Sequence, residues 1–446
     1  MKNLLNKYPY LEENHYVKIA NKTMQKKILR KNSRNLGLIT DDLLYVLETL
    51  DGLKNLNDVC KILSEKFNEP LKEVIKQIFN LLDNFPYIKF LDEPSEHKTK
   101  ILYENKNDYP SHLDIEITNH CNHRCLYCFN ESLPEKKKFM DVNKFISLID
   151  KMAKNGLETI VISGGEPLTH PDIYKTVKHA CDNLVAVKLN TNGYLLTHFI
   201  YQFKEFSNLD IQVTLNSSTP EIHEKLSNAN IEGLHETVVK NINAATKHGL
   251  KILLVMNIVP ENVDDIENMC KLANNLMCEE FMIGEIEIAG RANSDLYVNT
   301  SSERIQNIYE EMNKKYDMKF LKNIERKEFL DCLVRTNCGI FSEFVGIDCD
   351  GNIRLCTFAR DYLKANNVFN VNLDEYFKAL DELSIADVDE PGKEYCYGCR
   401  YIEECSHCIY QGLLMRDMIG RECEWGKSKM VTDLVDGLKS LQIKEA

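Results

Sequence analysis

Three cysteines stand within the eight residues of the segment CNHRCLYC, at Cys121, Cys125 and Cys128. Thiolates with this spacing can ligate one metal centre from a single loop. A [4Fe–4S] cubane normally takes four cysteine ligands, so three would leave one iron open to bind another molecule. A zinc ion would need a fourth ligand, which His120 or His123 could supply, but zinc loops favour Cys-x2-Cys pairs. The motif therefore favours an iron–sulfur cluster with an open site.

The elements that must position this loop alternate between strands and helices over residues 101–300. An amphipathic helix is expected at 145–156, and strand patterns occur at 113–118, 159–165, 184–193, 210–216, 251–259 and 280–288. Repeated strand–helix units predict a parallel sheet of about six strands, which suits a partial barrel better than one of eight. In such barrels the site lies at the carboxyl ends of the strands. CNHRCLYC, SGGEP and LNTNG each follow a strand, so we expect one shared site.

Separate domains are expected on either side of this core, at residues 1–100 and 301–446. The first domain is expected to contain three helices followed by a strand at 87–91, which indicates a winged-helix-like unit. The helices are expected at 41–52, after Asn57 as N-cap, and from Pro70 to Leu82. Gly52 is expected to end the first helix, and the polar segment 92–100 to act as a linker. The C-terminal domain holds nine of the sixteen cysteines and only short elements, which is typical of a small domain stapled by metal clusters.

Composition restricts the class of protein. The net charge of -13 disfavours nucleic acid as the main partner, because phosphate binding needs a basic surface. No apolar run approaches the roughly 18–20 residues that span a bilayer, and the N-terminus lacks the apolar segment of a signal peptide. We therefore expect a cytoplasmic protein with no membrane partner. Cytosolic thiols stay reduced, so the clustered cysteines indicate metal binding rather than disulfides.

The cysteine motif, with Tyr127 before its third cysteine, resembles the signature of the radical S-adenosylmethionine (SAM) enzymes. The resemblance implies that the open iron of a [4Fe–4S] cluster on Cys121, Cys125 and Cys128 chelates the amino and carboxylate groups of SAM. One electron from the cluster then splits the sulfonium, and the resulting 5′-deoxyadenosyl radical abstracts hydrogen from the substrate. An electron donor such as flavodoxin or ferredoxin is implied as a partner.

Other segments agree with this resemblance. SGGEP is similar to the family's GGEP motif, and Glu166 in it could accept from the methionine ammonium; LNTNG and TLNSS match segments that contact SAM. For each polar residue, capping of its own loop is the alternative. The arginine that many relatives place near the SAM carboxylate is not evident, and Lys225 is a candidate replacement. The implied cofactor-binding residues are Tyr127, Gly164, Gly165, Glu166, Pro167, Asn190, Thr191, Asn216, Ser217 and Asn257.

The C-terminal cysteines resemble the SPASM domain, whose pattern implies two auxiliary [4Fe–4S] clusters. One gap departs from that pattern, since two residues rather than three separate Cys405 from Cys408. Zinc binding is the alternative, and Cys349 could compete as a ligand. The implied ligands are Cys332, Cys338, Cys356 and Cys408 for one cluster and Cys396, Cys399, Cys405 and Cys423 for the other. The five remaining cysteines, Cys60, Cys181, Cys270, Cys278 and Cys349, are expected to be core or free thiols.

The N-terminal segment resembles the PqqD-like element that recognises leader peptides on enzymes modifying ribosomally made peptides. Its mode would be β-augmentation, in which the leader of a precursor peptide adds a strand to an exposed edge. Nine lysines and arginines in the first 35 residues face only Glu12 and Glu13, which indicates either a solvated face or a dock for an acidic peptide.

The whole arrangement resembles the sactipeptide thioether synthases, which join a cysteine sulfur to the α-carbon of another residue in the precursor. Carbon–carbon crosslinking and epimerisation are alternatives with the same parts. Thr357 stands where sulfatase maturases carry a catalytic aspartate, which argues against formylglycine formation. Two alternatives lie outside this class of enzyme. One is a DNA-binding regulator that senses through an iron–sulfur cluster, which conflicts with the net charge of -13; the other is a scaffold protein that binds zinc.

Overall fold

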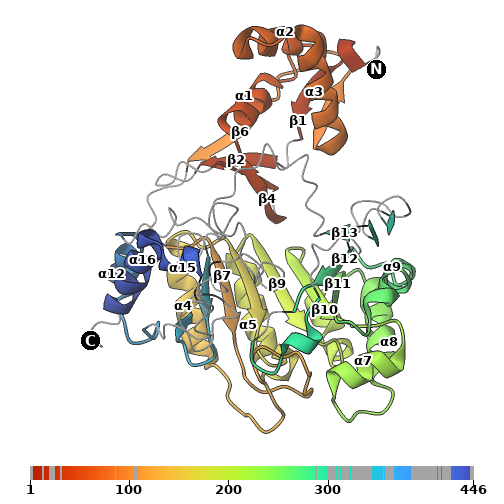
Figure 1. Cartoon of the computed structure of the whole chain (residues 1–446), viewed down its shortest axis with the longest axis vertical. Coiled ribbons are helices and arrows are strands. Elements are labelled where there is room, and N and C mark those ends of the chain that lie inside the picture. Colours follow the sequence, from red (N-terminus) through yellow and green to blue (C-terminus); the bar gives the residue numbers. More distant parts are fainter. Residues whose placement is uncertain are drawn as a thin grey trace. The chain divides into compact units, whose positions relative to one another are not determined.

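The computed structural model of the chain describes residues 4–12, 15–19, 26–30, 33–85, 87–103, 109–286, 289–298, 344–354, 366–382 and 423–441, with a few isolated positions besides (Figure 1). These residues fall into two compact units that divide near residue 107. The sequence pattern places this boundary at residue 100. The boundary lies further along the chain than predicted, because strand β6 (Lys100–Tyr103) pairs with β2 (His15–Ile19) and so belongs to the first unit.

Three helices and two small sheets make up the described part of the first unit. The helices are α1 (Asp41–Thr49), α2 (Leu56–Phe67) and α3 (Leu71–Asn84). One sheet has the order β4-β3-β2-β6, with β3 at Lys26–Arg30 and β4 at Ser33–Ile39; in the other, β1 (Tyr8–Leu11) pairs antiparallel with β5 (Ile88–Leu91). The expected helices and the strand at 87–91 are confirmed, and their apolar stripes share one core.

The ends of two helices in this unit differ from the predictions. Helix α2 begins at Leu56, and its N-cap is Asn55, whose side chain accepts from the amide of Asp58 at 2.9 Å. The predicted cap, Asn57, is wrong because it already lies within the first helical turn. Helix α1 ends at Thr49, before the predicted stop at Gly52.

The polar segment 92–100 does more than connect two domains. The amide of Ser95 donates to the carbonyl of Gly52 at 3.0 Å, and the amide of His97 donates to the carbonyl of Asp51 at 2.8 Å. These contacts use backbone groups, which any residue type supplies, so a polar composition gave no sign of them. The segment therefore packs along the first unit before it enters β6.

A parallel sheet forms the centre of the second unit, with the strand order β13-β12-β11-β10-β9-β8-β7-β14-β15. Every neighbouring pair is parallel except β14 and β15. The sheet confirms the expected parallel architecture of a partial barrel, with the six expected strands at its middle. Their bounds, with the short outer strand last, are β7 (His112–Glu116), β8 (Thr159–Ser163), β9 (Ala186–Thr191), β10 (Leu209–Thr214), β11 (Lys251–Asn257), β12 (Glu280–Gly284) and β13 (Leu321–Lys322).

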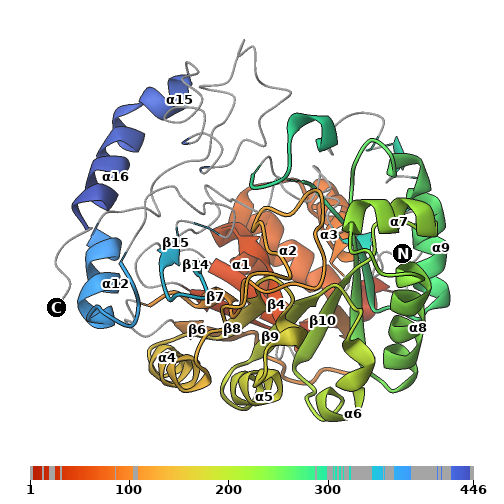
Figure 2. The same ribbon diagram turned by 90° about the horizontal axis from the view of Figure 1, so that it is seen from below.

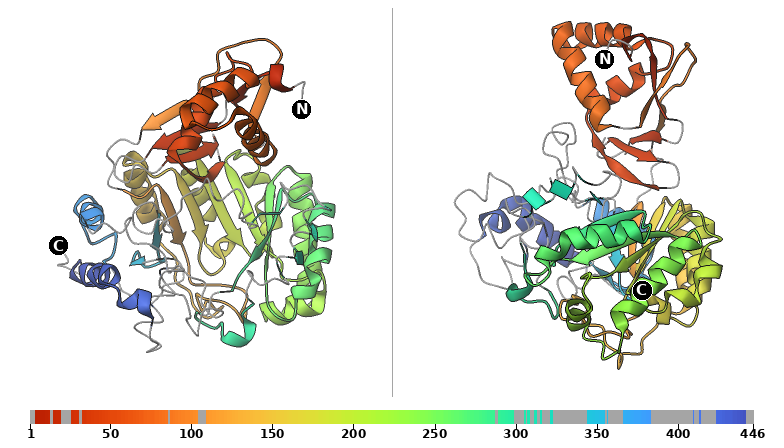
Figure 3. Two further views of the ribbon diagram at one scale, coloured as in Figure 1. Left: turned by 45° about the horizontal axis from the view of Figure 1, so that its top comes forward. Right: turned by 90° about the vertical axis from the view of Figure 1, so that its right-hand side faces the viewer.

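Helices cover one face of this sheet. Figure 2 shows the helices that connect successive strands along the outer side of the curved sheet, and Figure 3 shows the strands fanning across the unit inside them. The four longer connecting helices are amphipathic and turn their apolar stripes to the strands. The helices are α4 (Val142–Lys154), α5 (Ile173–Asn183), α6 (Ile200–Phe203), α7 (Pro220–Ser227), α8 (Leu234–Lys247) and α9 (Ile266–Asn275).

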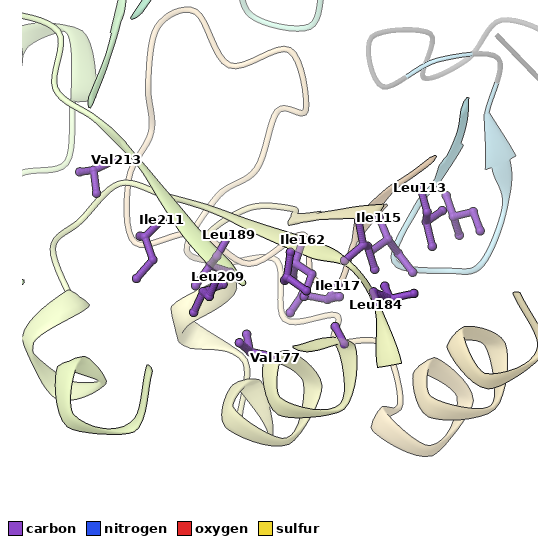
Figure 4. Close-up of a cluster of buried hydrophobic side chains, with 14 of the residues drawn as sticks. Leu113, Ile115, Ile117, Ile162, Val177, Leu184, Leu189, Leu209, Ile211 and Val213 are labelled. Carbon is purple, nitrogen blue, oxygen red and sulfur yellow. The ribbon is translucent and has the colours of Figure 1, made fainter. Parts of the chain in front are cut away.

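The two faces of the central strands differ in polarity. In β9, Val187 and Leu189 are buried in the core between sheet and helices, whereas Lys188 and Asn190 point to the other face. Figure 4 shows Leu189 and its neighbours from β7 to β10 gathered above Val177 of α5. Alternation in β9 and β10 therefore leaves polar side chains on the face that is turned away from the helices, whereas the apolar residues of β11 are buried on both faces.

A hairpin that we did not expect extends the sheet beyond β7. Strand β14 (Phe344–Ile347) runs parallel to β7, and β15 (Ile353–Arg354) returns antiparallel to it. The buried Arg354 guanidinium donates to the Glu116 carboxylate of β7 at 2.8 Å and to Asp348 of the hairpin turn at 3.3 Å. This ion pair fixes the start of the C-terminal segment against the strand that leads to the cysteine loop.

Three helices are described beyond this hairpin: α12 (Leu373–Glu382), α15 (Glu424–Lys427) and α16 (Lys429–Ser440). The apolar residues of α16, with Trp425 of α15, belong to the same core as the sheet. Among the helices that the structure describes, none is both long and apolar enough to cross a bilayer.

Substitution of Arg354 by methionine tests the buried ion pair. R354M leaves the Glu116 carboxylate buried without its cation, which costs about 3–5 kcal/mol. Lys138 offers a matched control, because it also joins the hairpin to the loop beyond β7 but pairs with Asp350 at the surface. K138M is expected to cost less than about 1 kcal/mol. Urea unfolding followed by far-ultraviolet circular dichroism measures both, and equal midpoints for the two variants would contradict this assignment.

Candidate active site

The three motif cysteines lie on the loop that leaves β7, and their thiols interact. Burial, together with the nearby Cys128, raises the pKa of Cys125 to about 12. Burial also raises the pKa of Cys121 well above that of a free thiol, with Glu166 and Cys125 adding to the shift. Cys121 and Cys125 are therefore protonated at neutral pH without a metal, and a metal centre must displace their protons to bind.

Two glycines of SGGEP bring β8 into backbone contact with the start of this loop. The amide of Gly165 donates to the carbonyl of Thr118 at 2.7 Å, and the amide of Glu166 donates to the carbonyl of His120 at 2.8 Å. A β-carbon on Gly165 would lie 2.0 Å from the His120 oxygen, and one on Gly164 would lie 2.4 Å from the Thr118 oxygen. We expected these glycines to make room for a ligand; in this structure they make room for the chain that carries Cys121.

Glu166 anchors the segment after β9. Its fully buried carboxylate accepts from the Thr191 hydroxyl at 2.6 Å and from the amides of Asn192 and Leu168 at 2.7 and 3.1 Å. Burial raises its pKa to about 7, although these three donors act in the opposite direction. The Asn192 side chain in turn donates to Asn122 of the cysteine loop at 2.7 Å. The predicted residues Glu166 and Thr191 thus meet each other, and Asn192, which the motif comparison missed, reaches the loop. Pro167 opens the short turn after Glu166.

Asn216 joins two strand ends to Tyr127. Its side-chain amide donates to the Tyr127 hydroxyl at 2.6 Å, and its side-chain oxygen accepts from the amide of Asn257 at 3.1 Å. Burial raises the pKa of Tyr127 well above its usual value. The structure therefore brings three predicted residues from β10, β11 and the cysteine loop together as one hydrogen-bonded group.

A buried aspartate holds the segment after β10. Asp265 accepts from the hydroxyls of Ser217 and Ser218, each at 2.6 Å, and from the amide of Ser218 at 2.6 Å. Asn262 adds a second anchor, because its side-chain amide donates to the backbone carbonyl of Asn216 at 2.7 Å. Ser217 thus serves its own loop here, as the capping alternative anticipated, and the two anchors lay outside every motif in the sequence.

Helix α7 supports the middle of the cysteine loop. The amides of Arg124 and Leu126 donate to the carbonyls of Ser227 and Leu226 at 3.1 and 3.0 Å. Lys225, the candidate partner for a SAM carboxylate, is largely exposed on the same helix and donates to Glu261 at 2.8 Å. Its ammonium is therefore engaged at the surface.

Arg291 supports the loop from the segment after β12, and sequence reasoning missed it. Its guanidinium donates to the carbonyls of Cys125 and Ser132 at 2.9 and 3.1 Å, and its amide donates to the carbonyl of Cys128 at 3.1 Å. A β-carbon on the preceding Gly290 would lie 2.4 Å from the carbonyl oxygen of Phe129. A glycine next to an arginine after a strand was the available signal, but it is too common to be specific.

Several predicted residues remain to be placed. The side-chain oxygen of Asn190 is buried and has no hydrogen-bond partner within the described ranges. Cys356 and Cys423 are half-buried, and Cys349 is buried in the hairpin turn. The expected core thiols Cys60, Cys181, Cys270 and Cys278 are confirmed as buried. Outside the described residues lie Cys332, Cys338, Cys396, Cys399, Cys405 and Cys408.

The site fits a SAM-binding iron–sulfur cluster. Cys121, Cys125 and Cys128 supply the thiol donor set of a three-cysteine cubane, and the unpartnered oxygen of Asn190 offers a hydrogen-bond acceptor on the polar side of β9. In the part of the chain that the structure describes, no three His, Cys, Asp or Glu side chains converge as around a single metal ion; the ligands of a cubane sit on separate irons.

Comparison with known proteins identifies the family. The model of the radical SAM superfamily matches residues 115–273. The chain is 23% identical over 402 residues to the "Antilisterial bacteriocin subtilosin biosynthesis protein AlbA" of Bacillus subtilis, which covers 86% of this chain and 87% of that protein. It is 30% identical over 232 residues to a "Probable GTP 3',8-cyclase" of Methanococcus aeolicus, covering 49% of this chain and 72% of that protein.

Solved structures agree on the fold. Streptococcus suis SuiB bound to S-adenosylmethionine superimposes with a TM-score of 0.60 and 12% identity, over 95% of this chain and 99% of that one. SuiB bound to its precursor peptide SuiA gives a TM-score of 0.59 and 14% identity over the same shares. The chain therefore belongs to the radical SAM superfamily, whose members bind SAM and a [4Fe–4S] cluster.

Alanine at Gly165 is expected to remove the cluster. The added β-carbon meets the His120 carbonyl at 2.0 Å and must push the cysteine loop away from β8. Gly249 is a matched control, because it has a φ of +84° but open space around it, so G249A costs about 1–2 kcal/mol of backbone strain and nothing at the loop. Electron paramagnetic resonance of the reduced, reconstituted protein, with and without SAM, measures the effect. A parent-like, SAM-sensitive signal in G165A would contradict the packing argument.

Glu166 gives the metal-free protein a distinctive dependence on pH. Its pKa in the folded state is about 7, above the ordinary 4.5, so the folded state binds the proton more tightly. Stability from this group is present below pH 4.5 and falls by roughly 3 kcal/mol between about pH 4.5 and 7. Buried His123 and His223, whose pKa values fall to about 4 and 3, act in the opposite direction.

The difference between the parent protein and E166Q isolates the Glu166 contribution, because the histidines contribute equally to both. Urea unfolding at a series of pH values should show the stability of the parent falling relative to E166Q as the pH rises from 4.5 to 7. Parallel curves would show that Glu166 is not buried as described.

Proposed function

We propose that this radical SAM enzyme modifies a ribosomally made precursor peptide and forms thioether bonds between cysteine sulfur and carbon. The observation that carries the proposal is the match along most of the chain, rather than the core alone, to the subtilosin biosynthesis protein. SuiB, whose fold matches over 95% of this chain, has been crystallised with a precursor peptide. If the two proteins shared only the reaction of the radical SAM core, their similarity would not be expected to extend into the segments before and after that core.

The chain's own residues have separate tasks in this proposal. Cys121, Cys125 and Cys128 would hold the cluster, which would supply the electron for reductive cleavage of SAM and so the radical that abstracts hydrogen. Asn190 faces the polar side of the sheet with an unused acceptor and orients the cofactor. Tyr127 and Asn216 hold the third cysteine in register with the ends of β10 and β11.

The first unit would recognise the leader of the precursor. Strands β4 and β6 are the outer strands of its four-stranded sheet, so each offers an unpaired edge among the described residues. An extended peptide can add a strand to such an edge. The basic composition of the first 35 residues favours an acidic leader.

The C-terminal cysteines would hold two auxiliary [4Fe–4S] clusters. Cys356 follows the β14–β15 hairpin, which the Arg354–Glu116 pair fixes to β7, and Cys423 caps α15 by accepting from the amide of Gly426 at 3.4 Å. Both cysteines are thus attached to ordered elements of the second unit. An acidic one-electron carrier such as flavodoxin or ferredoxin would supply the electrons from the cytoplasm.

Mass spectrometry of a treated precursor tests the proposal. Thioether formation removes two hydrogens from the peptide: one leaves carbon as an atom, and one leaves the thiol as a proton while an iron–sulfur cluster accepts one electron. Incubation of a cysteine-containing precursor, encoded beside the gene, with reconstituted enzyme, SAM and reductant should remove two hydrogens and one free thiol per bond. The control is C128A, which should leave the peptide unchanged.

The alternatives give different readouts in the same experiment. Loss of two hydrogens with every thiol intact would replace the thioether with a carbon–carbon bond. An unchanged mass in ordinary water that rises in D2O would indicate epimerisation, and no change in either solvent would exclude that peptide as substrate.

A further inference from the structure

Arg291 reaches the cysteine loop from a distant part of the chain. It follows β12 and lies 166 residues from Cys125, yet it donates to the Cys125 carbonyl at 2.9 Å and to the Ser132 carbonyl at 3.1 Å. Its backbone amide adds a third bond, to the carbonyl of Cys128 at 3.1 Å. One residue therefore holds the loop at Cys125, at Cys128 and at Ser132, four residues further on.

Gly290 shows that this contact is close-packed. It adopts a φ of +61°, and a β-carbon there would lie 2.6 Å from the Cys128 oxygen as well as 2.4 Å from the Phe129 oxygen. The Gly290–Arg291 peptide thus runs directly against the backbone of the loop. A side chain at position 290 would push this peptide away from the cysteine loop, so the contact requires glycine at this position.

The charge of Arg291 lies beside the motif cysteines. Its guanidinium is hydrogen-bonded to the Cys125 carbonyl at 2.9 Å, so the cation is held next to a residue that would carry the cluster. The chain carries a net charge of -13, which opposes the addition of an electron to a buried centre. A cation held within the loop favours the reduced, more negative form of a cluster, and the low dielectric of a buried site strengthens that effect.

We propose that Arg291 is a positioning residue that holds the cysteine loop by the carbonyls of Cys125 and Ser132 and places a positive charge that makes its cluster easier to reduce. A lysine would keep the charge but not the arrangement, because one ammonium lacks the planar fork that reaches both carbonyls. The inference concerns the cluster alone and does not depend on the peptide substrate.

Redox titration of the reconstituted full-length protein, followed by the SAM-sensitive electron paramagnetic resonance signal, tests this proposal without any peptide. In R291Q, the equilibrium constant for reduction should fall at least about tenfold, which is 59 mV for a one-electron couple. In R291K, it should stay within about threefold of the parent while the line shape changes. The control is R124Q, because Arg124 stands on the same loop but pairs with Glu135 at the surface; both its potential and its line shape should match the parent.

The outcomes separate cleanly. A midpoint in R291Q equal to that of R124Q and the parent would overturn the proposed charge effect. If R291Q holds no SAM-sensitive cluster, R291K decides: a potential close to the parent's supports the proposal, and a tenfold fall overturns it. Loss of the cluster in both Arg291 variants, with R124Q intact, supports the positioning role.

Discussion

The structure depends on close contact between backbone and backbone at the carboxyl ends of its parallel strands. The cysteine loop contains no helix or strand of its own, so its shape must come from groups that meet it. Backbone amides and carbonyls from β8, α7 and the segment after β12 provide these contacts, and Gly165 and Gly290 allow them because a β-carbon at either position would overlap the loop. The cysteines are therefore held by a rigid barrel edge, as a cluster with defined geometry requires.

Buried polar groups form a second layer behind the loop. Glu166 and Asp265 are carboxylates with little or no exposure. Glu166 accepts from Leu168 after β8 and from Thr191 and Asn192 at the end of β9, and Asp265 accepts three hydrogen bonds from Ser217 and Ser218 after β10. Burial of such groups is costly unless their partners are in place. Any displacement of these loops would leave several partners unsatisfied at once, so the network favours one arrangement of the strand ends, formed before the cofactor binds.

Most of the central sheet and the cysteine motif could be predicted from sequence, because both depend on local patterns. Apolar runs followed by polar or glycine-rich segments gave the six parallel strands, and the spacing of three cysteines gave the cluster loop. The β14–β15 hairpin could not be predicted, since its short strands exist by pairing with β7. Arg291 and Asp265 were missed for a similar reason: each acts on a loop at least 47 residues away, and neither lies in a motif. Contact of Gly164 and Gly165 with a ligand stays a prediction; their contact with the backbone of the cysteine loop could not be predicted, because it joins segments more than 40 residues apart.

The central claim is that radical chemistry at the cysteine loop removes hydrogen from a carbon of a precursor peptide. Transfer of deuterium from a precursor labelled at its α-carbons into 5′-deoxyadenosine tests it most directly, because the label reports which molecule lost the hydrogen. The account predicts 5′-deoxyadenosine that carries one deuterium and forms faster when the peptide is present. Unlabelled 5′-deoxyadenosine, formed at the same rate with and without the peptide, would contradict it.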